Sequence, residues 1–209
     1  SLRCVGELGL SNLRRYLLAE YNNKDSLVRF SAAWSGALLG DASAIAPLRE
    51  LAEQANPNSA KALDICFRRM DLAKANEWQK KLAKNPNKLR LATIATGIIG
   101  DPAGIPWLVE EMAVPELARV AGEAFTMITG VDIAYEDLEG EKPEGFDAGP
   151  TENPEDENVE LDPDEDLPWP DQKLVSSWWG KNQSKFSKST RYLLGKPISI
   201  EWLSTVLRD

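Results

Sequence analysis

The supply of reactive side chains limits the chemistry that this chain can perform. Its 209 residues contain no histidine, which is the commonest general base and a favoured transition-metal ligand. Ser-His-Asp catalysis, Cys-His catalysis and the ordinary zinc sites are therefore excluded, whereas carboxylate, lysine and tyrosine chemistry stay open. The strongest candidate groups, Asp101, Arg119 and Glu123, stand where helix capping or pairing between helices would use them. We therefore expect a protein that is not an enzyme and has no cofactor.

Three aspartates have the spacing that opens a calcium-binding loop. Asp162, Asp164 and Asp166 alternate with other residues, as the first ligands of an EF-hand do. The glycine and the later glutamate of that motif are missing, and Pro163 stiffens the segment. The favoured interpretation is a solvated acidic segment, with calcium binding as a weaker alternative. No other metal site is predicted.

One stretch of the chain sets its net charge of −9. Residues 1–131 hold 16 basic and 14 acidic residues (net +2), residues 132–171 hold one and 17 (net −16), and residues 172–209 hold seven and two (net +5). No single basic stripe of the kind that binds nucleic acid is evident. No apolar run approaches the roughly 18 residues that cross a bilayer. We expect neither a nucleic-acid partner nor membrane insertion, and the two separate cysteines, Cys4 and Cys66, favour a cytoplasmic location.

A period of about 30 residues organises the first 131 positions. Gly40-Asp41 and Gly100-Asp101 stand 60 residues apart, and each follows an apolar stretch and precedes a proline by five or six residues. Weaker anchors at Gly9, Met70 and Gly130 complete the series. A glycine suits the left-handed end of one helix, the aspartate suits a cap, and the proline suits the first turn of the next helix. Each period therefore predicts a helical hairpin.

Such hairpins leave an apolar face that only a neighbouring copy can cover, so the copies must stack. The predicted fold is all-α: an α-solenoid of about four to five HEAT-like helical hairpins over residues 1–131. An acidic, irregular connector follows over 132–170, and its composition is typical of extended or disordered chain. A small tryptophan-rich helical capping module completes the chain over 171–209.

Within the capping module we expect a helix over about 172–186 that begins after Asp171, a tight return at 191–195, and a last helix that begins after Ser199. Trp178 and Trp179 stand side by side in the first of these helices. The favoured interpretation is a lid that packs over the last repeat. The alternative is that a tryptophan, above all Trp179, anchors a partner.

Particular strings carry a resemblance to known repeats. The first repeat, from Val28-Arg29 to Pro47-Leu48, resembles the short HEAT-like repeat of the phycocyanobilin-lyase type. Residues 89–209 are similar to an uncharacterised bacterial family of HEAT-repeat proteins. The strings that carry this likeness are Gly100-Asp101-Pro102, Ile105-Pro106-Trp107-Leu108, residues 117–125, residues 128–132, residues 161–171 and Arg191-Tyr192-Leu193-Leu194-Gly195. The resemblance implies proteins often encoded near type VI secretion clusters, and it implies no catalytic residues.

Binding is expected on the second helices of the repeats, which commonly line the concave face of a solenoid. The candidate protein-binding residues are Arg49, Glu50, Lys80, Lys81, Lys84, Trp107, Glu110, Glu111 and, in the capping module, Trp179. An ordinary solvated face is the favoured interpretation of the charged positions. The alternative is a mixed-charge groove with a basic centre near Lys80, in which the acidic connector lies until a partner displaces it.

Two classes of function remain open. The first is a protein–protein interaction scaffold or adaptor, with a role as an accessory protein of a type VI secretion system if the resemblance holds. The second is an enzyme or cofactor-handling protein like the bilin lyases that share the repeat type. We expect the first, with another protein as the partner. The identity of that partner and the oligomeric state do not follow from the sequence.

Overall fold

A computed structural model describes residues 1–54, 57–146, 148–149 and 161–208. These residues are mostly helical, and a two-stranded hairpin is the sheet found among them, so the predicted all-α class is confirmed. The chain divides into two compact units, Ser1–Ala75 (unit 1) and Asn76–Asp209 (unit 2). Across the described ranges, no helix has the length and apolar character needed to span a bilayer.

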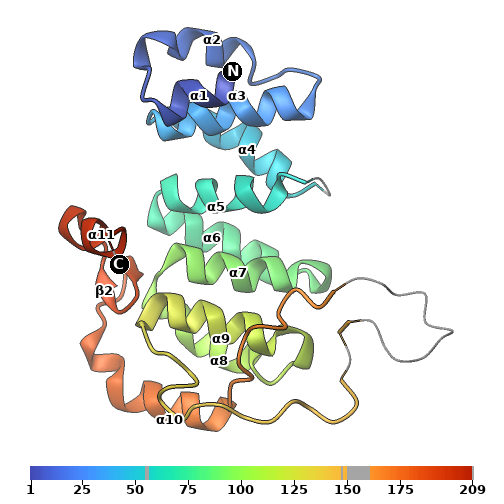
Figure 1. Cartoon of the computed structure of the whole chain (residues 1–209), viewed down its shortest axis with the longest axis vertical. Helices are drawn as coiled ribbons and strands as arrows, with labels where there is room; N and C mark the ends of the chain where they lie inside the picture. The colour runs from blue at the N-terminus through green and yellow to red at the C-terminus, as the bar shows by residue number, and fades with distance from the viewer. Residues whose placement is uncertain (55–56, 147, 150–160, 209) are drawn as a thin grey trace, which may run out of the picture. The chain divides into compact units, whose positions relative to one another are not determined.

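Unit 1 is built from short helices in sequence order (Figure 1). They are α1 (Leu2–Glu7), a 3₁₀ turn η1 (Ser11–Leu13), α2 (Arg14–Ala19), α3 (Ser26–Leu38), a 3₁₀ turn η2 (Ala42–Ala44), α4 (Ile45–Ala52), α5 (Ser59–Arg69) and the first residues of α6 (Leu72–Ala83). Helix α3 packs against α1 on one side and α5 on the other, and α4 packs against both α3 and α5. The helices of unit 1 therefore pair with their neighbours in chain order.

Small residues allow these helices to approach closely. A Cβ on Gly6 would lie 2.5 Å from the Cα of Ser35, so α1 and α3 meet almost backbone to backbone. The core between them is made of apolar side chains that are at most 3% exposed, among them Leu17, Phe30 and Leu48. Cys66 on α5 is fully buried with its Sγ 3.8 Å from the carbonyl oxygen of Ile45. Burial raises the pKa of this thiol to about 12, because an apolar site disfavours the thiolate.

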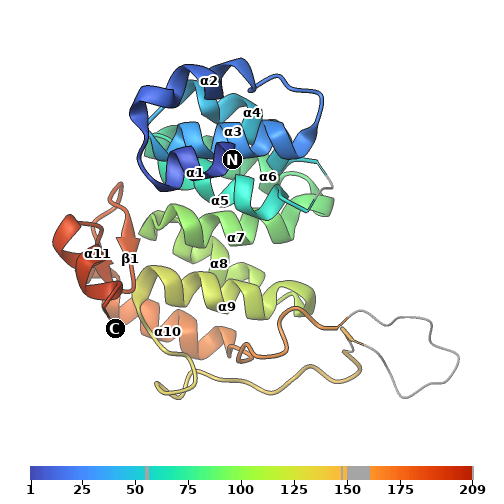
Figure 2. The same cartoon turned by 45° about the horizontal axis from the view of Figure 1, so that its top comes forward.

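Unit 2 continues the same pattern and then adds the C-terminal elements. They are the rest of α6, a 3₁₀ turn η3 (Pro86–Lys88), α7 (Leu89–Ile99), a 3₁₀ turn η4 (Pro102–Gly104), α8 (Ile105–Glu111), α9 (Pro115–Thr129), α10 (Gln172–Asn182), a 3₁₀ turn η5 (Gln183–Lys185), β1 (Tyr192–Leu193), β2 (Lys196–Pro197) and α11 (Ile200–Val206). Helices α7 and α9 pack side by side, and α8 packs against both (Figure 2). Gly97 lets α7 approach the backbone of Ala124 on α9.

The turns that join the paired helices have the predicted conformation. Gly40 and Gly100 have φ angles of +81° and +72°, which only glycine adopts without strain. The carboxylates of Asp41 and Asp101 then accept hydrogen bonds from the N–H groups of Ser43 and Ala103, each at 3.0 Å. Both aspartates therefore cap the 3₁₀ turn that begins the second helix. These caps confirm the prediction made from the Gly-Asp pairs.

Backbone hydrogen bonds join the two ends of the predicted connector. Gly140 donates from its N–H to the carbonyl of Trp169 at 2.7 Å, and Asp171 donates to the carbonyl of Leu138 at 2.8 Å. An isolated antiparallel bridge joins Glu139 to Pro170 beside them. Residues 147 and 150–160 of the connector lie outside the described residues. The division of the chain at 131 and 170 stays a prediction.

Beyond the connector, α10 begins where Asp171 caps it and joins the core of unit 2. Val175 on α10 is fully buried, and α10 packs against α8. Trp178 meets the ring of Phe125 edge-on with 5.6 Å between ring centres, and Trp179 lies 5.4 Å from Phe186. Both tryptophans are half-buried against this core, which is the arrangement expected of a lid.

The predicted tight return and last helix are also present. β1 and β2 form a hairpin whose two turn residues, Leu194 and Gly195, have φ angles of +48° and +80°, as a two-residue hairpin turn requires. The hydroxyl of Ser199 then accepts a hydrogen bond from the N–H of Trp202 at 3.1 Å and caps α11.

Candidate binding site

Two arginines on neighbouring helices of unit 2 hold the described end of the acidic connector. Arg90 lies on α7 and Arg119 on α9, and in Figure 1 the chain that leads into α10 runs past these two helices. Arg90 donates two parallel hydrogen bonds, of 2.7 and 2.6 Å, to the two carboxylate oxygens of Asp164. Such a two-pronged contact is the strongest and most directional pairing of arginine with a carboxylate.

Arg119 makes three further contacts from a buried position. Its side chain is 6% exposed, and it donates to the carbonyl oxygen of Asp164 at 2.7 Å and to the carboxylate of Asp162 at 2.5 Å. The guanidinium also lies over the ring of Trp169, 4.5 Å from the ring centre, an arrangement that attracts a cation to the aromatic face. We name Arg90, Arg119, Asp162, Asp164 and Trp169 the arginine site.

The bound segment is shaped for this contact. The N–H of Asp164 donates to the carboxylate of Asp162 at 2.9 Å, which forms a local turn. Burial raises the pKa of the Asp162 carboxyl, but hydrogen bonds from Arg119 and from the Asp164 N–H outweigh it, so the net shift is downward. Both aspartates thus point at arginines while Asp166 faces solvent. The site as a whole recognises two carboxylates, a carbonyl and an aromatic ring in one short segment.

This geometry bears on the calcium alternative. The carboxylates of Asp162 and Asp164 are engaged by guanidinium groups, and Asp166 is exposed. In the part of the chain that the structure describes, no three acidic, cysteine or histidine side chains gather as metal ligands would. The alternative therefore has no structural support.

The residues predicted to bind a partner lie elsewhere on the chain. Arg49 and Glu50 are on α4 of unit 1, where Arg49 pairs with Glu53 at 3.5 Å. Lys80 and Lys81 lie on α6 and Lys84 directly follows it, and all three are exposed. The two groups belong to different units, so the mixed-charge groove stays a prediction.

The other predicted positions lie on α8 and α10. Trp107 is half-buried and packs against the core of unit 2, whereas Glu110 is exposed. Burial and the neighbouring charge of Glu110 raise the pKa of Glu111, and a hydrogen bond from Trp107 opposes that rise. Trp179 lies on α10 against Phe186. The structure therefore brings none of these four residues to the arginine site.

One alternative places the connector in a groove near Lys80 on the second helices, and its described end does not lie there. That end lies on Arg90 and Arg119, which belong to first helices. Sequence reasoning weighed Arg119 only as a pairing residue and did not single out Arg90. A usable signal was the arginine that recurs near the start of the first helices, at Arg29, Arg90 and Arg119.

The hairpin of β1 and β2 is a second segment of the chain that lies against the C-terminal ends of α7 and α9 (Figure 2). Tyr192 donates from its N–H to the carbonyl of Gly100 at 2.8 Å. Leu194 and Gly195 donate to the carbonyls of Met127 and Ile128 at 2.8 and 3.1 Å. Two extended segments of unit 2 are thus held on α7 and α9, which are the first helices of their hairpins.

Comparisons of the chain with protein-family models, with curated proteins and with solved structures return no match.

Proposed function

We propose that this chain is a protein-binding scaffold that captures acidic, extended segments of other proteins on the first helices of an α-solenoid. Several features support the solenoid. Helices pair in chain order in each unit, the Gly-Asp turns recur 60 residues apart, and α10 packs against α8 after the long connector. Helix α10 then acts as the second helix of a fifth hairpin that begins with α9, interrupted by the connector.

The arginine site carries the proposal for binding. Arg90 and Arg119 hold a segment that presents Asp162, Asp164 and Trp169. Because most of this recognition goes to carboxylates, a backbone carbonyl and a ring face, another chain with the same pattern would satisfy the same donors. The connector is then an internal occupant, and a partner must compete with its high effective concentration.

The charge distribution fits this competition. Residues 132–171 carry a net charge of −16, and the chain before and after them carries +2 and +5. A partner with a denser acidic segment displaces the connector and makes the same contacts. Salt weakens the binding of the connector and of the partner to the arginine site. The resemblance noted above adds a setting, as a cytoplasmic accessory protein of a type VI secretion system.

A peptide in trans tests the proposal. The probe is a fluorescein-labelled peptide with the sequence of residues 161–171, titrated by fluorescence anisotropy with wild-type protein and with Asp162→Asn/Asp164→Asn. The double variant releases the internal segment, so we expect it to bind the peptide about tenfold more tightly than the wild type.

The matched control is Glu165→Gln/Asp166→Asn, which removes the same charge from two exposed neighbours. It should bind the peptide as the wild type does. A peptide with asparagine at the positions of Asp162 and Asp164 should not bind any of the three proteins. If the two double variants bind the peptide equally, the arginine site is only an internal brace and the proposal is lost.

A further inference from the structure

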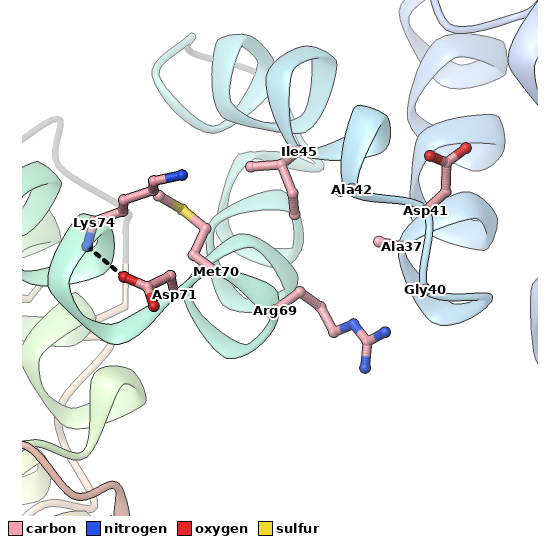
Figure 3. A pocket seen from close by; sticks show the side chains of 9 residues that line it. All are labelled: Ala37, Gly40, Asp41, Ala42, Ile45, Arg69, Met70, Asp71 and Lys74. Carbon is pink, nitrogen blue, oxygen red and sulfur yellow. Dashed lines mark hydrogen bonds between the residues drawn. The ribbon is translucent and has the colours of Figure 1, made fainter.

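Unit 1 has an open cleft at the place where unit 2 is covered by its own chain. The cleft has a volume of about 260 Å³ and lies between the turn after α3 and the turn after α5. We name it the turn cleft, and its principal lining residues are Gly40, Asp41, Ile45, Arg69, Met70 and Lys74. Figure 3 shows the two walls facing each other, with Gly40, Ala42 and Ile45 on one side and Arg69, Met70 and Lys74 on the other.

The repeat gives each wall a counterpart in unit 2. Sixty residues after Gly40 and Ile45 stand Gly100 and Ile105, and sixty residues after Met70 stands Gly130. Gly100 and Gly130 are two of the points at which the C-terminal hairpin approaches the helices of unit 2 most closely. A Cβ on Gly100 would lie 2.4 Å from the carbonyl oxygen of Tyr192, and one on Gly130 would lie 2.6 Å from the carbonyl carbon of Leu194. The counterpart of the turn cleft is therefore filled.

The contacts of that internal occupant are mostly to backbone. N–H groups of Tyr192, Leu194 and Gly195 donate to carbonyls at the C-terminal ends of α7 and α9. Arg191 adds its guanidinium to the carbonyl of Ile99 at 3.0 Å, and the N–H of Ser189 reaches the carboxylate of Asp101 at 3.3 Å. Backbone donors on helix-end carbonyls require no particular side chain. Any extended segment that turns in the same way can make them.

The turn cleft offers the same kind of acceptor. Gly40 has the φ of Gly100, and within the described residues no donor reaches its carbonyl oxygen. Ile45 and Met70 supply an apolar floor beside it (Figure 3). The Gly40 wall therefore has the backbone of its counterpart at Gly100, whereas the second wall carries Met70, with an extended backbone, where unit 2 has the left-handed Gly130.

The charges of the turn cleft differ from those of its counterpart. The carboxylates near the cleft are already used, because Asp41 pairs with Arg14 and Asp71 caps α6 through the N–H groups of Ala73 and Lys74. Arg69 and Lys74 are exposed, and no carboxylate lies within ion-pair distance of either in the ranges described. The Nη2 of Arg69 lies 3.4 Å from the position that a Cβ on Gly40 would occupy. The guanidinium group therefore lies at the edge of the cleft beside Gly40.

In unit 2 the cation belongs to the occupant, as Arg191, and Thr129 stands where unit 1 has Arg69. In unit 1 the cation is on the wall, so the occupant must carry the opposite charge. We infer that the turn cleft binds an extended segment of a partner protein in which a carboxylate precedes an apolar residue and a tight turn. This inference goes beyond the proposed function, because the turn cleft shares no residue with the arginine site.

The test uses two synthetic peptides and the full chain. The first peptide has the sequence of residues 189–195 with Arg191→Glu, and the second keeps the arginine. Binding is followed in amide ¹H–¹⁵N spectra of ¹⁵N-labelled protein, which also locate the site. We expect the glutamate peptide to shift the signals of Gly40, Met70 and Asp71, and to bind about tenfold more tightly than the arginine peptide.

Charge-reversed variants complete the test. Arg69→Glu/Lys74→Glu should invert the preference between the peptides, whereas Lys24→Glu/Lys61→Glu changes the net charge equally at exposed positions outside the cleft and should preserve it. The inference is overturned if neither peptide binds, if both bind equally to wild type, or if the shifted signals lie elsewhere. It is also overturned if the free protein sediments as a dimer that the Arg69 and Lys74 reversal dissociates, since a second copy would then fill the cleft. A loss of peptide binding at the arginine site has no bearing on peptide binding at the turn cleft, so the two proposals can fail separately.

Discussion

The Gly40-Asp41 turn of unit 1 and the Gly100-Asp101 turn of unit 2 share a backbone and differ in what covers it. Asp41 is held by Arg14 at 3.0 Å and by the hydroxyl of Tyr21 at 3.0 Å. Asp101 is held by the neutral amide of Asn76 at 2.9 Å and by the N–H of Ser189. The oxygen that accepts the capping N–H is also contacted by Arg14 in unit 1 and by Ser189 in unit 2, and the other oxygen accepts from Tyr21 or from Asn76. The aspartate of the Gly-Asp turn is therefore held by a charged side chain in one repeat and by a distant segment of the chain in another.

Among the substitutions that test this difference, Tyr192→Ala should have the largest effect on stability. Tyr192 is 5% exposed, its ring lies 5.2 Å from that of Phe186, and its hydroxyl accepts the N–H of Ser187 at 2.9 Å. Removing a buried aromatic side chain costs about 3–5 kcal/mol. We expect that loss in the free energy of opening of unit 2, read by site-resolved hydrogen exchange, with unit 1 unchanged. Tyr16→Ala, at a half-exposed site, is the control, and equal losses in both units would show that the hairpin is not specific to unit 2.

Alanine at the two turn glycines compares the covered and the open turn directly. Both positions have positive φ, so both variants lose roughly 1–2 kcal/mol to backbone strain. At Gly100 the new Cβ also collides with the carbonyl of Tyr192, whereas at Gly40 it meets only the end of Arg69. We expect Gly100→Ala to lose about 1 kcal/mol more than Gly40→Ala, through the hairpin hydrogen bonds. Urea titration measures both, and a reversed order would contradict the covering of unit 2.

Acid should loosen the Asp41 turn. Burial raises the pKa of Asp41, but hydrogen bonds from Arg14, Ser43 and Tyr21 outweigh it and bring the pKa to about 2. A carboxyl whose pKa is lower in the folded state contributes stability above its unfolded pKa, near 4, and loses that stability as pH falls toward 2. The protection of the α2 amides against exchange, measured relative to the intrinsic exchange rate at each pH, should therefore fall between about pH 4 and pH 2. Asp41→Asn should be less stable at neutral pH and should lack this dependence.

The smallest effect is expected from Arg69→Glu/Lys74→Glu. Both side chains are exposed and bear no ion pair among the described residues, so the free energy of unfolding should change by less than about 0.5 kcal/mol. Thermal unfolding at low salt measures it. A larger loss would mean that the two cations stabilise unit 1, and the contrast between an open and a covered turn would then need another explanation.

Local features of the fold were predictable from the sequence. The Gly-Asp turns, the caps at Asp171 and Ser199 and the tight return before Gly195 each depend on the conformational preference of one or two residues. The middle anchor shows the limit of such reasoning, because Met70 has a φ of −73° and an extended backbone where its counterparts are left-handed glycines. Periodicity located that turn without giving its conformation.

The arginine site could not be predicted in the same way. Arg90 and Asp164 are 74 residues apart, and nothing in local pattern or composition says which of many cations a carboxylate will reach. Composition alone predicted a solvated acidic segment, whereas Asp164 is 7% exposed. The paired arginines overcame that expectation, because a buried carboxylate is tolerated when its hydrogen bonds are satisfied.

The buried thiol of Cys66 gives unit 1 a chemical reporter of its own opening. Only the thiolate reacts with alkylating reagents, and at pH 8 a group with a pKa near 12 is almost entirely protonated as well as shielded by α4 and α5. Its labelling rate therefore follows the exposure of the core, while exposed Cys4 reacts from the native state and serves as the internal standard. An occupant of the turn cleft, whose wall includes Ile45 beside that sulfur, would slow the labelling without touching Cys66.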